Sequence, residues 1–409
     1  MQIVVVGGGA AGFFGAIACA QAHPQAHITL LEASQTLLAK VRVSGGGRCN
    51  VTHACFDPAL LVQQYPRGGK ALRGAFSRFQ PQDTVAWFQQ HQVALKTEAD
   101  GRMFPITDDS HTIVQCLLQT ARDLGIQIRT GASVQMVTPG AGGFQVGLMS
   151  GERLAGDRLL LATGSSPQGW RIAKRLDHAI VPPVPSLFTF KVHDPRLEGL
   201  AGISVDPVQV RLVCAKVPPK QLGLVQMGPL LVTHWGVSGP AILKLSAWGA
   251  RVLHDNGYRG QLTVNWVPAF KGDEVRSVLQ ATKGTVPKRT IAAHCPVNLP
   301  QRLWQRLGVS VGIPVDQRWA DLTKAELNGL VQRLTQDQYA IEGKGIFKEE
   351  FVTCGGVALQ DVNFKTMESR SCPGLYFAGE VLDIDGITGG FNFQSAWTTG
   401  WLAGQAMGS

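Results

Sequence analysis

The first residues whose spacing could support chemistry are glycines near the start of the chain. Gly7, Gly9 and Gly12 match the pattern GxGxxG, and Glu32 follows twenty residues after Gly12. In a dinucleotide site the first glycine permits a tight turn, the second lets the backbone approach a pyrophosphate, and the third lets helix and strand pack closely. The later acidic residue accepts hydrogen bonds from a ribose hydroxyl. The spacing therefore predicts a dinucleotide site, with a glycine-rich core turn as the alternative.

The elements that would position these residues lie on either side of the glycines. Residues 2–6 form a β-branched run typical of a buried parallel strand, a helix is predicted to end at Ala22, and residues 27–31 form a second strand that delivers Glu32. The uncharged stretch 3–20 has nearly the length of a membrane span. However, its clustered glycines are poor helix formers and no basic segment precedes it. We therefore expect strand, glycine turn and helix, and no membrane span.

Three further glycine clusters could approach the same ligand. Residues 44–50 read SGGGRCN, and such a run exposes backbone N–H groups to a planar ring or a phosphate. The apolar run 158–162 ends in Thr-Gly, the run 374–377 ends in Ala-Gly-Glu, and GITGGFNFQ (386–394) precedes a small-residue helix. We expect the first and last portions of the chain to share one sheet and to hold one ligand, with the middle inserted between them.

The local patterns also predict the organisation of the chain. Residues 58–125 are predicted to be mostly helical, and three strands are predicted over 127–137, 143–149 and 153–162. The four predicted parts are a nucleotide-binding domain, first part (1–185), a strand-rich insert (186–268), a helical insert (269–339) and the C-terminal part of the nucleotide-binding domain (340–409).

Composition limits the classes of partner and metal. The 409 residues include 38 Lys and Arg against 29 Asp and Glu, a net charge of +9, but the basic residues are scattered and no nucleic-acid motif is present. A mildly basic surface is therefore expected rather than a nucleic-acid partner. The eight cysteines are widely spaced without a CxxC pair, which argues against disulfides, zinc and iron–sulfur sites. We expect reduced thiols, no metal and a cytoplasmic location.

Taken in order, the motifs resemble those of the BaiN-like, aminoacetone-oxidase-like family of bacterial FAD-dependent oxidoreductases. They are GGGAAG (7–12) with Glu32, SGGGRCNVT (44–52), LATG (161–164), THWGVSGPA (233–241), GGV (355–357), TMES (366–369) and GLYFAGEVLDIDGITGGFNFQSAW (374–397). The resemblance covers nearly the whole chain. It implies an α/β fold in which a Rossmann-like FAD-binding domain of the glutathione-reductase type is split by a β-barrel-like part and a small helical part.

The resemblance also implies which residues hold FAD. The early glycines would hold the pyrophosphate, Glu32 the adenosine ribose, and Val134 the adenine through its backbone. Glu380 would bind the ribityl chain or the pyrophosphate, and the start of the last helix would lie near the pyrimidine edge of the flavin, where a helix N-terminus stabilises negative charge. The predicted cofactor-binding residues are Gly7, Gly9, Ala10, Ala11, Gly12, Glu32, Ala33, Lys40, Ser44, Gly45, Gly46, Gly47, Arg48, Cys49, Asn50, Val134, Thr163, Gly164, Gly379, Glu380, Gly389, Gly390, Phe391 and Asn392.

The implied activity is hydride transfer between flavin and a small organic substrate. No second GxGxxG supplies a separate NAD(P)H domain, so NAD(P)H is a candidate only as a transient reductant, and dioxygen is equally permitted as acceptor. Arg48, Cys49 and His53 could assist, but no catalytic residue is assigned; packing is favoured for His53, and the isolated Cys49 does not favour a dithiol relay. Two alternatives remain: an RNA-modifying flavoprotein, motivated by the net charge and the basic helical insert, and a flavin-binding redox sensor.

Overall fold

The computed structural model describes residues 1–140, 142–215, 224–345 and 352–408. The chain divides into two compact units, one formed by Met1–Pro183 with Val352–Ser409 and the other by Val184–Phe351. The first unit therefore contains both ends of the chain, and the second is inserted into it.

The first unit is built around a seven-stranded sheet in the order β20-β21-β22-β10-β1-β2-β6. The five consecutive strands from β22 to β6 pair in parallel, and β20 and β21 add antiparallel pairs at the opposite edge. The parallel strands β1, β10 and β22 are almost wholly apolar and buried, as expected where both faces of a sheet are covered. The strands are β1 (Gln2–Val6), β2 (His27–Leu31), β6 (Gln127–Arg129), β10 (Arg158–Leu161), β20 (Val362–Asn363), β21 (Glu368–Ser369) and β22 (Leu375–Phe377).

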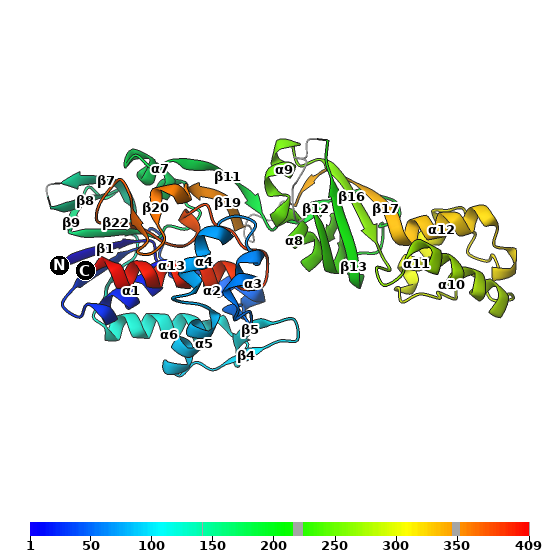
Figure 1. The fold of residues 1–409 in the computed structure, drawn as a ribbon, viewed down its shortest axis with the longest axis horizontal. Helices are drawn as coiled ribbons and strands as arrows, with labels where there is room; N and C mark the ends of the chain where they lie inside the picture. The colour runs from blue at the N-terminus through cyan, green and yellow to red at the C-terminus, as the bar shows by residue number, and fades with distance from the viewer. Residues whose placement is uncertain (141, 216–223, 346–351, 409) are drawn as a thin grey trace. The chain divides into compact units, whose positions relative to one another are not determined.

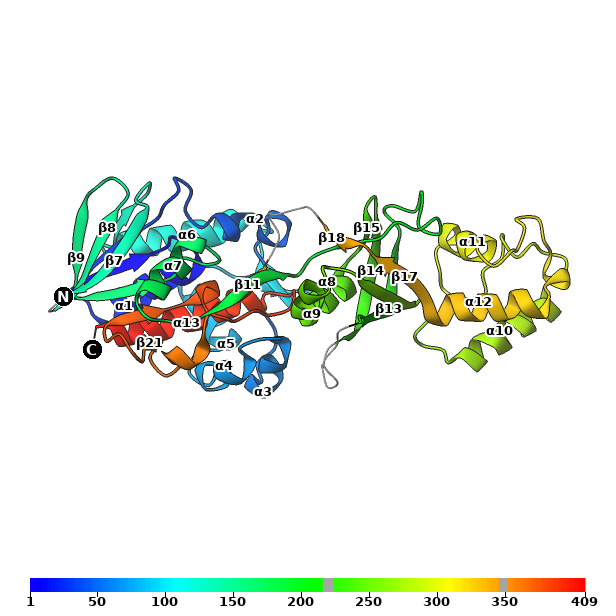
Figure 2. The same ribbon diagram turned by 90° about the horizontal axis from the view of Figure 1, so that it is seen from above.

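Helices from the two ends of the chain lie side by side in this unit. Figures 1 and 2 show α1 (Ala10–Ala22) alongside α13 (Phe391–Met407), with the two termini at the same end of the unit. Small residues allow this approach: a Cβ on Gly400 would lie 2.7 Å from Ala11 O, and one on Gly404 would lie 2.5 Å from Gly15 O. The C-terminal segment is therefore packed into the fold that the N-terminal segment begins.

The remaining elements of the first unit surround the sheet. Two small antiparallel sheets have the orders β7-β8-β9 and β3-β5-β4, and β11 pairs with β19. These strands are β3 (Thr52–His53), β4 (Leu95–Thr97), β5 (Arg102–Pro105), β7 (Val134–Gly140), β8 (Gly143–Leu148), β9 (Arg153–Gly156), β11 (Ile180–Ser186) and β19 (Val352–Val357). The helices are α2 (Ala39–Gly47), α3 (Pro58–Leu61), α4 (Gly69–Phe76), α5 (Pro81–Gln90), α6 (Ser110–Asp123) and α7 (Pro167–Arg175).

Two predicted strands are each divided between two sheets. The predicted strand 127–137 breaks between β6 and β7, where Gly131 has a φ of +65° and its N–H donates to Ser34 O. The predicted strand 153–162 breaks between β9 and β10, where Asp157 N donates to Gln2 O at 2.7 Å. Residues 58–125, predicted to be mostly helical, also contain the hairpin β4–β5. Contacts with distant segments decide these breaks.

The second unit contains a seven-stranded sheet in the order β17-β16-β13-β14-β15-β12-β18. Its two edge strands are consecutive in sequence, because β17 (Asp337–Ile341) ends two residues before β18 (Gly343–Lys344) begins. The sheet must therefore curl until its edges adjoin, as a barrel-like part would. Its other elements are β12 (Phe190–Lys191), β13 (Ser204–Val213), β14 (Val225–Thr233), β15 (Gly236–Ser238), β16 (Gly260–Asn265), α8 (Pro240–Trp248) and α9 (Ala250–Asp255).

Three helices, α10 (Gly272–Thr285), α11 (Gln301–Val309) and α12 (Lys324–Gln336), form the helical part of the second unit. Their apolar side chains join the sheet in one hydrophobic core. β17 pairs with β16, so the predicted start of the C-terminal part at residue 340 falls inside a strand of the second unit. The four-part division stays a prediction, and residues 346–351 of the predicted C-terminal part lie outside the described residues. Within the described residues, no helix is long and apolar enough to cross a membrane.

Candidate functional site

The glycine turn between β1 and α1 has the form that a phosphate-binding loop requires. Gly7 has a φ of +115°, and a Cβ there would lie 2.3 Å from Ala162 O. A Cβ on Gly12 would lie 1.9 Å from Gly7 O, so both positions need glycine for close backbone packing. By contrast, a Cβ on Gly9 would have no atom within 4 Å. Gly9 therefore leaves open space at the N-terminus of α1, where a helix attracts anions.

Glu32 lies at the carboxyl end of β2, beside this turn. Its carboxylate accepts hydrogen bonds from Gly8 N and from Ser34 N, both at 2.8 Å. Ala132 N donates to Glu32 O at 2.8 Å, which brings the segment leading to Val134 alongside. Ala33 follows Glu32, and Val134 is buried at the start of β7. The carboxylate is thus fixed next to the glycine turn, as a ribose-binding acid would be.

The glycines of SGGGRCN form a left-handed turn at the end of α2. Gly45, Gly46 and Gly47 have φ values of +59°, +70° and +84°. A Cβ on Gly45 would lie 2.9 Å from the Phe104 ring, whereas Cβ atoms on Gly46 and Gly47 would meet nothing within 4 Å. Two successive open backbone positions result, and Ser44 begins the turn by donating to Val41 O at 3.0 Å.

The side chains of the three residues after these glycines make contacts within the protein. The Arg48 guanidinium pairs with Glu98 at 2.6 Å and lies 4.0 Å from the centre of the Phe104 ring. Cys49 is fully buried, and burial raises the pKa of its thiol to about 12. With its amide oxygen facing Gly390 N (2.9 Å), Asn50 joins this turn to the start of α13. Their predicted flavin contacts stay predictions.

A lysine and a carboxylate that are far apart in sequence meet on the other side of the glycine turn. Lys40 Nζ lies 2.5 Å from Glu380 Oε2 and 3.0 Å from Ser165 Oγ. Glu380 Oε1 accepts a hydrogen bond from Thr353 N at 2.9 Å. Glu380 follows β22, so its carboxylate stands at the carboxyl end of the parallel sheet, where ligands of such sheets bind. A Cβ on Gly164 would lie 3.9 Å from Glu380 Oε2.

Close backbone packing holds Gly379, Ala10, Ala11 and Thr163 in position. Gly379 has a φ of +73°, and its N–H donates to Thr399 Oγ1 on α13 at 2.9 Å. A Cβ on Gly379 would lie 2.7 Å from that of Ala11, so α1 passes directly beside it. Ala10 is the first residue of α1. Thr163 is adjacent to α7, because a Cβ on Gly169 would lie 1.8 Å from its Oγ1.

The N-terminus of α13 is held by contacts from several elements. Gly390 has a φ of +91°, and a Cβ there would lie 2.5 Å from Thr52 O. His53 Nδ1 lies 3.0 Å from Gly389 O, and its ring stacks on Phe391 at 4.6 Å. Asn392 exchanges two 2.9 Å hydrogen bonds with the backbone of Gly386. Within the described chain, no side chain caps this helix start.

Several residues that support the site escaped sequence reasoning. Ser165 and Thr353 fix Lys40 and Glu380, and Gln394 Oε1 accepts hydrogen bonds from the Thr52 and Thr84 hydroxyls at 2.6 and 3.0 Å. Ser165, Thr84 and Thr353 stand outside the quoted motifs, and Thr52 and Gln394 stand inside them without an assigned role, so only the fold reveals these contacts. Asp385, in the segment before α13, forms a buried ion pair with Arg67.

The sequence of residues 1–406 matches the HI0933-like protein Rossmann domain. The chain belongs to the HI0933-like family. With the motifs above, this places the HI0933-like chain among flavin-dependent oxidoreductases with a Rossmann-type FAD-binding fold, as the sequence predicted.

Relatives of this HI0933-like chain cover nearly all of its length. It is 29% identical to the 3-dehydro-bile acid delta(4,6)-reductase of Clostridium scindens, over 99% of this chain and 98% of that protein. It is 30% identical to the ribosomal RNA dihydrouridine synthase of Escherichia coli, over 98% of this chain and 96% of that protein. Its fold is similar to that of the 3-ketosteroid-delta4-(5alpha)-dehydrogenase of Rhodococcus jostii RHA1, with a TM-score of 0.51, 14% identity, and 100% and 97% of the two chains covered.

Proposed function

We propose that this HI0933-like protein uses FAD to reduce a carbon–carbon double bond that is conjugated to a carbonyl group. The names of the two relatives described above share this chemistry. A 3-dehydro-bile acid with double bonds at positions 4 and 6 is a conjugated dienone, and dihydrouridine is uridine whose ring double bond, conjugated to a carbonyl, has been reduced. This common reaction is the observation that carries the proposal.

The residues of the first unit fit FAD. Open backbone positions at Gly9, Gly46 and Gly47 leave room for a phosphate and a ring, and the fixed Glu32 carboxylate suits an adenosine ribose. Lys40 stands where a cation could pair with phosphate oxygens, since its ammonium group is half exposed and already faces an anion, Glu380. When bound, FAD would supply the hydride to the substrate.

The chain's own contribution is to orient the ligand and to stabilise negative charge near the N-terminus of α13. The uncapped N-terminus of α13 presents backbone N–H groups, and its partial positive charge favours negative charge nearby. The Tyr65 hydroxyl donates to Phe391 O at 2.7 Å, and the His53 stack holds the same turn. These contacts fix the helix start, so its dipole would be preorganised toward the ligand.

The proposed reaction consumes one reductant and one proton for each double bond. NAD(P)H gives up a hydride and becomes NAD(P)⁺, one carbon of the double bond gains that hydride, and its neighbour gains a proton from solvent. The chain has no second GxGxxG. NAD(P)H would therefore bind transiently, without a domain of its own.

A reduction assay tests this function. Purified protein should be yellow, and anaerobic NADH or NADPH should bleach it. Addition of a conjugated enone should then restore the yellow colour and yield the saturated ketone by mass spectrometry. A protein that binds FAD and is reoxidised by dioxygen, but by none of a panel of enones or uridine derivatives, would contradict the proposal.

A second candidate substrate is uridine in RNA. It is favoured by the Escherichia coli relative named for ribosomal RNA, and by the charge of the helical part, where residues 269–336 carry ten Lys or Arg against five Asp or Glu. Incubation with RNA and NAD(P)H, followed by nuclease digestion and mass spectrometry, should show a gain of 2 Da in a uridine. Reduction of enones without any change in RNA would exclude this candidate and leave the first intact.

A further inference from the structure

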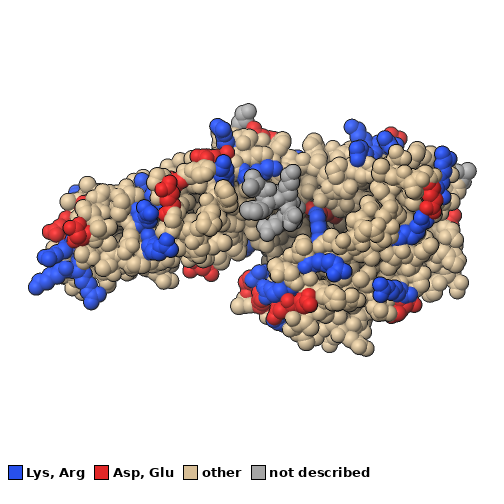
Figure 3. Space-filling model, turned by 180° about the vertical axis from the view of Figure 1, so that it is seen from behind, with Lys and Arg blue, Asp and Glu red and all other residues tan. Residues whose placement is uncertain are grey.

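The helical part of the second unit carries positive charge outside the residues of the nucleotide site. Residues 269–336 have a net charge of +5, more than half of the +9 of the whole chain. Of their ten cations, only Arg333 forms an ion pair with a described residue, Asp337, at 3.1 Å. Figure 3 shows Lys and Arg side chains projecting from the outer end of this part. The charge is therefore not neutralised within the described fold and is available to an anion.

Two loop segments, one before α11 and one before α12, bring three of these cations together. Thr290 faces Arg318 across an antiparallel β-bridge, and Trp319 N donates to Arg289 O at 3.0 Å. Residues paired in this way have Cα atoms about 5 Å apart. Lys288, Arg289 and Arg318 are all exposed. The three exposed cations therefore stand on two backbone segments that are directly adjacent.

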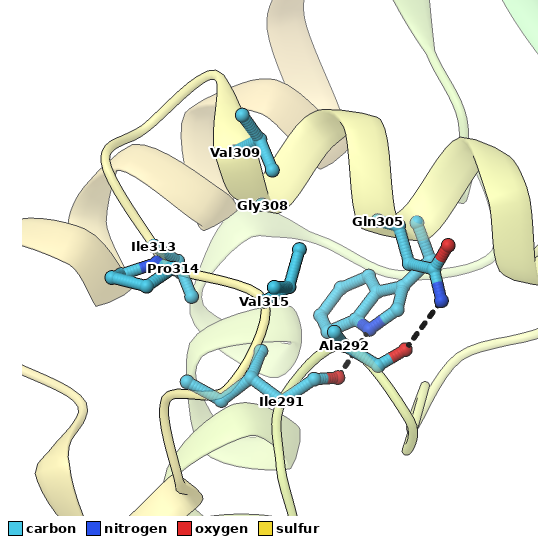
Figure 4. Close-up of a pocket in the computed structure, with 9 residues that line it drawn as sticks. Ile291, Ala292, Gln305, Gly308, Val309, Ile313, Pro314 and Val315 are labelled. Atoms are coloured by element: carbon cyan, nitrogen blue, oxygen red, sulfur yellow. Dashed lines mark hydrogen bonds between the residues drawn. The ribbon is translucent and has the colours of Figure 1, made fainter.

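Buried tryptophans hold these segments in place. The Trp304 and Trp319 rings stack with centres 6.3 Å apart, and both are buried. Figure 4 shows how α11 is tied to the segment that follows Thr290: Trp304 Nε1 donates to Ile291 O at 2.7 Å, and Gln305 Nε2 donates to Ala292 O at 3.3 Å. The backbone below the cations is thus preorganised, so little ordering would be needed on binding.

We propose that Lys288, Arg289 and Arg318 form a docking surface for the phosphate backbone of RNA. The proposal rests on the second candidate function, an RNA substrate. Arginine and lysine are the residues that contact phosphates, and such contacts position a nucleic acid without reading its sequence. Asp316 and Asp321 flank Arg318 in sequence, but neither forms an ion pair with a described cation. The three cations therefore keep their charge for the ligand.

Matched double variants test the surface. Lys288→Ala/Arg289→Ala removes two exposed cations of the surface, and Lys174→Ala/Arg175→Ala removes an exposed pair from α7 in the first unit. Both have the same net charge. The probe is a fluorescein-labelled RNA hairpin with a uridine-rich loop, titrated by anisotropy from 50 to 300 mM KCl. FAD absorbance, melting temperature and enone reduction are measured for every protein.

We expect the surface variant to weaken RNA binding by about tenfold and to lower the slope of log K against log salt by about 1.4 to 1.8. The α7 control should stay within about twofold, and Arg318→Ala should lower the slope further by about 0.7 to 0.9. Enone reduction should be unchanged in all variants.

Four results would overturn the proposal. Equal losses in the two double variants would mean that only net charge matters, and wild-type binding in both would place RNA elsewhere. Binding to phosphatidylserine vesicles but not to RNA would make the anion a membrane. If wild-type protein reduces enones but does not bind the hairpin at 50 mM KCl, the surface fails while the reductase function stands. If it binds RNA at this surface but reduces no double bond, the reductase proposal fails alone.

Discussion

Single carboxylates and backbone N–H groups do most of the positioning in the nucleotide site. The Glu32 carboxylate accepts two backbone N–H groups, and Glu380 accepts one while facing Lys40. Charged acceptors make stronger hydrogen bonds than neutral ones. Such residues should therefore affect cofactor affinity more than they affect folding.

Replacing Glu32 tests whether a single carboxylate affects cofactor affinity more than folding. Glu32→Ala removes the acceptor for Gly8 N, Ser34 N and a ribose hydroxyl. We expect the Kd for FAD to rise by about 10- to 100-fold, as the loss of a charged hydrogen bond worth ~1.5–3 kcal/mol implies. Glu32→Gln, which keeps one acceptor oxygen, should lose less. Glu198→Gln, an exposed site in the second unit, is the control, and equilibrium dialysis with FAD is the measurement.

Cys49 should be chemically silent despite its place in the SGGGRCN motif. Burial raises the pKa of its thiol from 9.0 to about 12, so the thiol stays neutral across pH 6–9. Thiolate is the reactive form, and none forms here in that range. Cys49→Ala should therefore leave the pH–rate profile unchanged, and iodoacetamide should not label Cys49 in the folded protein. Rapid labelling with loss of activity would contradict this.

At the level of elements, the site depends on how closely α1 and α13 approach. A Cβ on Gly404 would lie 2.5 Å from Gly15 O and 2.7 Å from the Ala18 Cβ. Both helices begin at glycine turns that we propose face the cofactor, so any separation between them would also disturb the glycine turn and the start of α13.

Two glycine-to-alanine changes separate packing from helix propensity. Gly404→Ala should lower the free energy of unfolding, because overpacking costs about 1–3 kcal/mol and exceeds the helix-propensity gain of up to ~1 kcal/mol. Gly74→Ala in α4 meets no atom within 4 Å and should be neutral or slightly stabilising. Urea unfolding followed by circular dichroism measures both. Equal effects of the two changes would show that the close approach is unimportant.

The sequence predicted those elements whose formation depends on local patterns alone. β1, α1, β2 and β22 could be predicted because each is an apolar run bounded by glycine or an acidic residue. The break between β9 and β10 was not predicted, because it arises where Asp157 pairs with Gln2, a residue far away in the sequence. Likewise, Lys40 and Glu380 are 340 residues apart, and no local pattern announces their ion pair.

For the whole molecule, the division into two units places the predicted cofactor-binding residues together in the first unit. Every predicted cofactor-binding residue lies in Met1–Pro183 or Val352–Ser409, and none lies in the inserted unit. The insert begins and ends beside the pair β11 and β19, where a Cβ on Gly355 would lie 2.6 Å from Pro182 O. The two ends of the first unit are therefore close enough to be joined directly.

Excision of residues 184–351 with a Gly-Ser linker of about six residues should therefore give a protein that still binds FAD. Its Kd for FAD should stay within about tenfold of the full chain, because the glycine turn, Glu32 and Glu380 are all retained. Binding of the RNA hairpin should be lost, since the proposed RNA surface of Lys288, Arg289 and Arg318 lies in the insert. A folded, excised protein that takes up no FAD would show that the insert completes the cofactor site. One that still binds the hairpin with wild-type salt dependence would move the RNA surface to the first unit.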